Sequence, residues 1–174
     1  MKKLSLILFS TLFLFLPQNL SIASQYIIKG KAIIIDGDTI KIKNKTIRFS
    51  GIDAPETKYR GKNQNCLLES VVIDCGWLSK QHLRSLIENK KVECELEKKP
   101  DQYKRKLGEC FVDNKSISRL MVKNGFAFDY PKYSKKKFAK VQEYAKKNKI
   151  GLWLMEFEYP WVWRHKVRSN IIKE

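Results

Sequence analysis

Residues 35–49 read IDGDTIKIKNKTIRF, and this segment decides the fold of the chain. Apolar and polar residues alternate on both sides of Asn44-Lys45, which predicts two β-strands joined by a two-residue turn. In this register two apolar pairs face each other, Ile42 with Ile47 and Ile40 with Phe49. The apolar side chains therefore share one face of a hairpin, and Arg48 projects from the other face, where its charge stays out of the core.

The segments around this hairpin predict a single α+β domain. Further strands are expected over residues 26–35, with a bulge at Gly30, and over residues 92–97 and 107–112. Helices are expected over residues 77–89, 117–124 and 135–148, and residues 50–65 are expected to form a loop. Five short strands and three helices, without the strand–helix alternation of a parallel sheet, indicate a domain built on a small barrel.

The start of the chain predicts an export signal. Lys2-Lys3 precede an apolar run over residues 4–16, and the small residues of Ser21-Ile22-Ala23 suit cleavage before Ser24. An uncleaved membrane anchor is the alternative, but the run is shorter than the roughly 20 residues that a spanning helix needs. We therefore expect a secreted or periplasmic bacterial protein without stable membrane insertion. Its mature part is one domain over residues 24–174, ending in a tryptophan-rich tail over residues 150–174 that packs on the barrel.

The charge of the chain favours a polyanionic partner. Lysine and arginine number 35 against 18 acidic residues, which gives a formal net charge of +17. Cations placed near phosphates release condensed counterions, so such an excess suits nucleic acid. A basic but indifferent surface, anionic lipid and cell wall remain open alternatives on charge alone.

Four cysteines in an exported chain suggest two disulfides. Of the three possible pairings, one follows from the predicted strands: a hairpin centred near Gln102 places Cys94 opposite Cys110. This pairing leaves Cys66 to bond with Cys75. A metal cluster is the alternative, but no two cysteines have the CxxC spacing of such sites.

Two aspartates are candidate ligands for a divalent cation. Calcium and magnesium prefer carboxylate and carbonyl oxygens, and a folded hairpin can bring Asp38 and Asp53 to one ion. Asp36 would then orient the ligands from behind. Taken alone, however, an Asp-Gly pair such as Asp36-Gly37 is more often a plain turn.

Three further side chains suit phosphodiester chemistry. Glu56 follows a proline in a constrained loop, where a carboxylate can orient water or accept its proton. Arg48 and Arg105 can each make a forked contact with phosphate oxygens and so stabilise charge in the transition state. A solvated loop glutamate and ordinary surface arginines are the alternatives for each residue considered singly.

Taken together in order, these motifs resemble the staphylococcal nuclease (thermonuclease) family over nearly all of the mature chain. The matching stretches are Ile35–Thr39, Ile47–Phe49, Gly51–Thr57, Asp101–Arg105, Asn124–Ala127 and Gly151–Trp153. The resemblance implies an OB-fold five-stranded β-barrel with three α-helices. It also implies calcium-dependent hydrolysis of DNA and RNA that leaves 3′-phosphate ends.

The resemblance also implies a role for each matching residue. Asp38 and Asp53 match the calcium carboxylates, and the carbonyl of Ala54 is the implied third ligand. Glu56 matches the general base or water-orienting residue, and Arg48 and Arg105 match the phosphate ligands. Tyr103 and Tyr133 match residues that contact the nucleotide. The chain departs from the family pattern at Lys104, which stands where a glycine commonly precedes the second arginine, in the short turn between Asp38 and Arg48, and in its cysteines.

The sequence thus predicts a monomeric, exported nuclease that uses Ca²⁺ and acts on DNA and RNA with little sequence preference. The alternative from another class is a non-catalytic nucleic-acid-binding OB-fold protein. The five chemical positions, Asp38, Arg48, Asp53, Glu56 and Arg105, argue for the enzyme. A third interpretation, a cationic protein that binds the cell envelope, rests on charge alone.

Overall fold

The computed structural model describes residues 26–171, so the expected signal peptide over residues 1–23 lies outside the described residues. The main sheet contains β1 (Tyr26–Gly30), β2 (Ala32–Asp36), β3 (Thr39–Ile42), β4 (Lys45–Phe49), β8 (Val92–Leu96) and β9 (Lys106–Val112). Their order is β1-β8-β9-β4-β3-β2, and β4 and β9 run parallel while the other neighbours are antiparallel. A short strand, β10 (Lys115–Ser116), pairs with β9.

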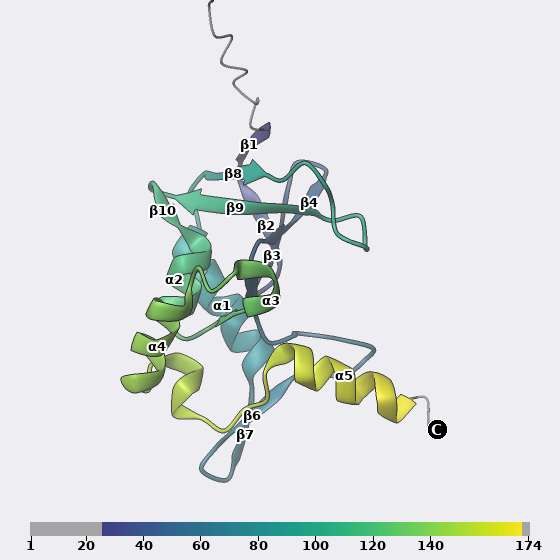
Figure 1. Cartoon of the computed structure of the whole chain (residues 1–174), viewed down its shortest axis with the longest axis vertical. Helices are drawn as coiled ribbons and strands as arrows, with labels where there is room; N and C mark the ends of the chain where they lie inside the picture. Colours follow the sequence, from purple (N-terminus) through teal and green to yellow (C-terminus); the bar gives the residue numbers. More distant parts are fainter. Residues whose placement is uncertain (1–25, 172–174) are drawn as a thin grey trace, which may run out of the picture.

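The sheet is curled, as an OB-fold barrel requires (Figure 1). β1 and β2 follow each other in the chain but stand at opposite ends of the strand order, so the sheet must turn back on itself. The expected single strand over residues 26–35 is split at Lys31 to make this corner. This arrangement confirms the predicted α+β fold.

The central hairpin forms with a different register from the predicted one. Its turn is Lys43-Asn44, with Ile42 opposite Lys45 and Ile40 opposite Ile47. Lys43 adopts a left-handed conformation with φ of 53°, which the two-residue turn needs. The two registers differ by two residues, and side chains alternate with a period of two, so the predicted inner face is still correct. Its apolar members are all buried: Ile40, Ile42, Ile47 and Phe49.

Helices cover the lower end of the barrel (Figure 1). They are α1 (Cys75–Ile87), α2 (Ile117–Lys123), α3 (Pro131–Ser134), α4 (Ala139–Lys147), the 3₁₀ helix η1 (Gly151–Leu154) and α5 (Pro160–Ile171). α1, α2 and α4 correspond to the three expected helices. α5 was not expected, and it begins with a proline at its first position, where the missing N–H costs no hydrogen bond.

The segment expected as a loop over residues 50–65 contains short pairings. β5 (Ile52–Asp53) pairs with β11 (Phe128–Asp129), and β6 (Asn65–Leu68) forms a hairpin with β7 (Val71–Asp74). β5 is short, but its pairing with β11 fixes Asp53 inside the protein.

Both predicted disulfides are present. Cys94 on β8 lies directly opposite Cys110 on β9, and the two are bonded across the strands. Cys66 on β6 is bonded to Cys75, the first residue of α1. The second bond therefore ties the β6–β7 hairpin to the start of α1.

A second apolar cluster fixes the C-terminal segment. It is centred on buried Phe128 and Leu152, with Trp153, Phe157, Tyr159 and Trp161 packed against them. The ring of Trp161 stacks on Tyr159 and on Tyr130, with centroids 4.6 and 4.8 Å apart. The tail thus packs on the domain as expected and brings α5 to the barrel. No helix among residues 26–171 combines the length and the apolar character that crossing a bilayer requires.

Candidate active site

The hairpin and β5 bring Asp38, Arg48 and Asp53 into one buried cluster. Arg48 Nη1 donates to Asp38 Oδ1 at 2.7 Å, and Arg48 Nη2 donates to Asp53 Oδ1. Asp38 also accepts hydrogen bonds from the Thr39 hydroxyl at 2.8 Å and the Ala54 amide at 3.1 Å. Burial alone would lower the pKa of Arg48, but the two carboxylates raise it, so the guanidinium stays charged.

Two glycines allow the backbone of this cluster to approach α1. A Cβ on Gly37 would lie 2.8 Å from the Ser79 Cβ and 2.9 Å from the Ala54 Cβ. A Cβ on Gly76 would lie 2.1 Å from the carbonyl oxygen of Glu56. Only glycine fits such close contacts, so these positions fix the acidic loops against α1.

Asp36 and Glu56 lie close to this cluster, and each carboxylate senses the charge of Asp38. Asp36 accepts hydrogen bonds from the Gly37 and Thr57 amides, which joins the two acidic loops. Burial, with a smaller effect from Asp38, raises the pKa of Asp36 to about 6 and that of Glu56 to about 7. A carboxyl group with a pKa near neutrality is suited to exchanging a proton with water at physiological pH.

A third arginine, Arg164 on α5, reaches the same carboxylates. Its Nη1 donates to Asp53 Oδ1 at 3.0 Å and to Glu56 Oε1 at 2.5 Å, and its Nη2 donates to Asp53 Oδ2 at 2.6 Å. Sequence reasoning missed this residue, because the tail was interpreted only as packing. Pro160, followed by eleven residues without a glycine or another proline, was the available signal for a helix that could carry it.

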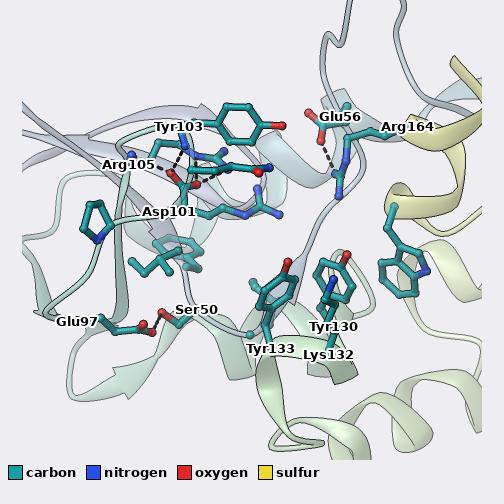
Figure 2. A pocket seen from close by; sticks show the side chains of 18 of the residues that line it. Ser50, Glu56, Glu97, Asp101, Tyr103, Arg105, Tyr130, Lys132, Tyr133 and Arg164 are labelled. Atoms are coloured by element: carbon teal, nitrogen blue, oxygen red, sulfur yellow. Dashed lines mark hydrogen bonds and ion pairs between the residues drawn. The ribbon is translucent and has the colours of Figure 1, made fainter. Parts of the chain in front are cut away.

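A groove of about 860 Å³ runs past this cluster. Arg48, Glu56 and Arg164 line it together with Arg105, so the structure brings the predicted catalytic residues to one surface. Figure 2 shows Tyr103 and Arg105 on one side of the groove and the Glu56–Arg164 pair on another. Asp38 and Asp53 are buried and are not among the lining residues.

The loop that carries Arg105 is held by its own first residue, Asp101. One carboxylate oxygen accepts the Tyr103 and Arg105 amides, each at 2.9 Å, and the other accepts the Arg105 Nε at 2.7 Å. Lys104 has a φ of 62°, a left-handed conformation that explains why glycine is common at this place in the family pattern. Lys104 therefore adopts the backbone conformation that the turn requires, and Arg105 still lines the groove.

Aromatic rings line the groove where nucleotide contacts were expected. Tyr103 and Tyr133 are both largely exposed and lie on different walls (Figure 2). The Arg105 guanidinium lies 5.3 Å from the centroid of the Tyr103 ring. Tyr130, which makes an edge contact with Tyr133, and Trp161 also line the groove, and neither was predicted as part of the site.

The donor set suits calcium in its chemistry. Hard oxygen ligands are supplied by the carboxylates of Asp38, Asp53 and Glu56 and by the carbonyl of Ala54. Counting Asp36, the site holds four carboxylates against the two guanidiniums of Arg48 and Arg164. Within residues 26–171 no three acidic, histidine or cysteine side chains converge as a ready metal cluster. Instead, Arg48 and Arg164 donate hydrogen bonds to carboxylate oxygens of Asp38, Asp53 and Glu56.

Comparisons with known proteins agree with the observed fold. A sequence profile described as staphylococcal nuclease homologue matches residues 46–155. The succinoglycan biosynthesis protein ExoI of Rhizobium meliloti is 33% identical over 136 residues, which cover 75% of this chain and 66% of that protein. The staphylococcal-like nuclease CAN1 of Arabidopsis thaliana is 30% identical over 153 residues, which cover 86% of this chain and 41% of that protein.

A bacterial relative carries a similar name. Endonuclease YncB of Bacillus subtilis is 32% identical over 130 residues, which cover 68% of this chain and 58% of that protein. The aligned regions thus span between about two fifths and two thirds of the length of these three relatives. With the profile match extending from β4 to the residue after η1, the chain belongs to the staphylococcal nuclease homologue family.

Proposed function

We propose that this protein is a secreted or periplasmic, calcium-dependent nuclease that hydrolyses phosphodiester bonds of DNA and RNA with little sequence preference. The observation that carries the proposal is the meeting of Arg48, Glu56 and Arg105 in one groove beside two buried aspartates. Family membership supports it, as do relatives that are named nucleases.

Glu56 is the group that would activate water. It lines the groove, and its raised pKa of about 7 lets it accept a proton near neutral pH. Its loop is held by buried Gln64, whose side-chain oxygen accepts a hydrogen bond from the Glu56 backbone amide at 3.2 Å and whose backbone amide donates to the Glu56 carbonyl at 3.1 Å. The carboxylate therefore has a fixed base from which to orient an attacking water.

The two predicted arginines would bind the phosphate from different sides. Arg48 projects from β4 and Arg105 from the loop before β9, so the phosphate would lie between two separate arms of the barrel. Charge grows on the phosphate oxygens as the bond to the leaving group breaks, and forked guanidinium contacts strengthen at that moment. Departure of the 5′-oxygen would give the 3′-phosphate end that the family resemblance implies.

Calcium would be held by Asp38, Asp53 and the Ala54 carbonyl, with Asp36 orienting the loops, and when bound it would neutralise charge on the phosphate. Tyr103 and Tyr133 would contact the bases or sugars. Stacking on aromatic rings accepts every base, which suits a nuclease without sequence preference. The large positive net charge, +17 for the full chain including Lys2 and Lys3 of the expected signal peptide, would draw polyanionic substrates to the groove.

The proposed location rests on the sequence and on the disulfides. Cleavage after residue 23 would release a single domain over residues 24–174 into an oxidising compartment, where the bonds Cys66–Cys75 and Cys94–Cys110 persist. We take the domain to act as a monomer, since a single chain supplies Arg48, Glu56 and Arg105 to the groove and the proposed chemistry needs no residue from a second copy.

A digestion assay tests the proposed function. Plasmid DNA and a structured RNA are incubated with the protein in calcium, in EGTA, and in EGTA followed by excess calcium. We expect cleavage that EGTA abolishes and calcium restores, with 3′-phosphate ends on the products. Glu56→Gln should lower the rate by about a hundredfold or more, because general-base catalysis contributes about 10²–10⁴.

The matched control is Glu69→Gln, at an exposed glutamate in the β6–β7 turn that does not line the groove. It removes the same charge and should cleave at the wild-type rate. Binding of nucleic acid without cleavage at any calcium level would identify the non-catalytic binding protein instead. Affinity for lipid or cell wall that survives both Glu56→Gln and nucleic-acid digestion would favour the envelope-binding interpretation.

A further inference from the structure

We propose that the Arg164 guanidinium is an internal occupant of the cation site, so that calcium can bind only when Arg164 releases Asp53 and Glu56. This inference rests on the proposed calcium dependence. It assigns to α5, a helix that lies beyond the residues matched by the family profile, a positioning role at the acidic cluster.

The contacts of Arg164 are those of a group that fills a site. Its two terminal nitrogens reach both oxygens of Asp53, at 3.0 and 2.6 Å, and one of them also reaches Glu56 at 2.5 Å. Asp53 is fully buried and its Oδ1 already accepts a hydrogen bond from Arg48. Both carboxylate oxygens of Asp53 therefore point at guanidinium groups, and an ion needs at least one of them free.

Charge makes the two occupants exclusive. A guanidinium and a divalent cation on the same carboxylate repel each other, and this repulsion is strong where water is excluded. The Arg164 side chain is only 17% exposed, and the side chain of Asp53 is not exposed at all. Calcium and Arg164 should thus compete, and each must weaken the binding of the other by the same factor.

The rest of α5 is anchored without Arg164, so the side chain can leave while the helix stays. Gln64 donates to the Glu158 carbonyl at 2.8 Å, two residues before α5 begins. Trp161 stacks on Tyr130 and Tyr159, and Val167 is buried. Arg164 also lines the groove, so the released side chain has open space to move into.

Gln64 fixes the start of α5 relative to the Glu56 loop. The same side chain that bonds the Glu158 carbonyl accepts the amide of Glu56, so the start of α5 and the Glu56 loop are held at a set distance. Arg164 is therefore presented to Glu56 and Asp53 by the fold and does not reach them by chance. Before metal binds, it would hold both carboxylates together and neutralise them in part.

Calcium affinity measured by isothermal titration calorimetry tests the proposal. We compare wild type, Arg164→Gln and Arg168→Gln after removal of metal by a chelator. Arg168 is the matched control, since it lies one turn further along α5, lines the groove, and makes no ion pair among the described residues. We expect Arg164→Gln to bind calcium about tenfold more tightly than wild type or Arg168→Gln. The apparent affinity is proportional to the fraction of molecules whose site is free, and this fraction rises when Arg164 is removed.

A second readout separates competition from a purely structural role. Without calcium, Arg164→Gln should unfold at a lower temperature than wild type. Added calcium should raise the unfolding temperature of Arg164→Gln by more than it raises that of wild type. Arg164→Lys keeps the charge but loses the forked contact with the two carboxylate oxygens of Asp53. It replaces Arg164→Gln in both measurements if Arg164→Gln does not fold. In either variant, calcium affinity equal to or weaker than that of Arg168→Gln would overturn the inference. Failure of wild type and all variants to bind calcium would instead overturn the calcium-dependent function, and this inference with it.

Discussion

Two arms of the groove carry the proposed chemistry, and they are built in opposite ways. The first arm, residues 36–56, places Asp38 and Asp53 in the core, where every carboxylate oxygen accepts a hydrogen bond. The second arm, residues 97–107, is a loop whose turn is closed by Asp101 and whose Tyr103 is largely exposed. In the first arm the functional groups are also part of what holds the protein together.

The difference teaches which substitutions can separate function from stability. Removing a charge from the first arm leaves a buried partner unpaired, so the free energy of unfolding and the activity should fall together. Removing a side chain from the second arm leaves a solvated loop whose backbone hydrogen bonds remain. Each of the following predictions would break or sharpen this contrast.

The largest effect on stability is expected for Asp53→Asn in the first arm. This change keeps the shape of the side chain but removes the negative charge between Arg48 and Arg164. Loss of one partner from a buried ion pair costs about 3–5 kcal/mol, so urea unfolding should show a fall of that order. The exposed aspartate Asp113, which pairs with Lys90, provides the control, and Asp113→Asn should cost roughly 1 kcal/mol or less. An unfolding free energy for Asp53→Asn close to that of the control would remove the contrast between the arms.

The largest separation of activity from stability is expected for Arg105→Ala in the second arm. The variant loses a partly exposed ion pair with Asp101, but the amides of Tyr103 and Arg105 remain bonded to that carboxylate. Cleavage should slow by about 10²–10³, as when a transition-state contact is removed, while the unfolding free energy changes by roughly 1 kcal/mol or less. Initial rates on plasmid DNA and urea unfolding measure the two quantities.

The control for Arg105→Ala is Arg119→Ala, at an exposed arginine on α2 outside the groove. It removes the same charge and should leave the rate unchanged. If Arg105→Ala cleaved as fast as Arg119→Ala, Arg105 would have no role in catalysis.

The contrast between the arms also explains what the sequence could predict. The alternation of apolar residues in β3 and β4 predicted which face packs in the core and placed Arg48 on the opposite face, even though the register was wrong by two residues. The prediction that the Arg48 charge stays unburied was wrong, because Asp38 and Asp53 enclose the guanidinium and leave the side chain only 14% exposed. Alternation has a period of two, so it cannot distinguish turns that differ by two residues. The identity of the turn depends on whether Lys43 adopts a positive φ, and lysine gives no sign of that.

The residue that could not be predicted, Arg164, depends on packing between distant segments. Its contacts join residues 108 and 111 positions apart in the chain, and they form only because Phe128, Tyr130 and Gln64 hold the C-terminal segment in place. Local patterns identify helices and turns but not which helix docks on which loop. The family resemblance gives no information on Arg164 either, because its last matching motif ends at Trp153.

A moderate gain in stability is expected from relieving the backbone of the second arm. Lys104 has a φ of 62°, where a glycine has no steric cost, so Lys104→Gly should raise the free energy of unfolding by roughly 1 kcal/mol or less. Lys43→Gly, at a φ of 53° in the hairpin of the first arm, is the comparison and should gain a similar amount. Lys115→Gly in β10, where the backbone is not left-handed, should instead lose stability. Urea midpoints rank the three variants, and a loss in Lys104→Gly would show that the loop is held by the lysine itself.

The smallest effect concerns acid stability in the second arm. Burial would raise the pKa of Asp101, but the hydrogen bonds from Arg105 outweigh it and lower the pKa below its ordinary value. A carboxyl group with a lowered folded pKa contributes stability above its unfolded pKa of about 3.9 and loses that contribution as the pH falls through the folded value. The difference in unfolding free energy between wild type and Asp101→Asn should therefore be present at pH 6 and shrink in the acid range below pH 4. In an Arg105→Ala background the shrinkage should be weaker, because the side-chain hydrogen bond from Arg105 is the largest of the contacts that lower the pKa. A difference that stays constant with pH would mean that Asp101 holds the loop through its shape and not through its charge.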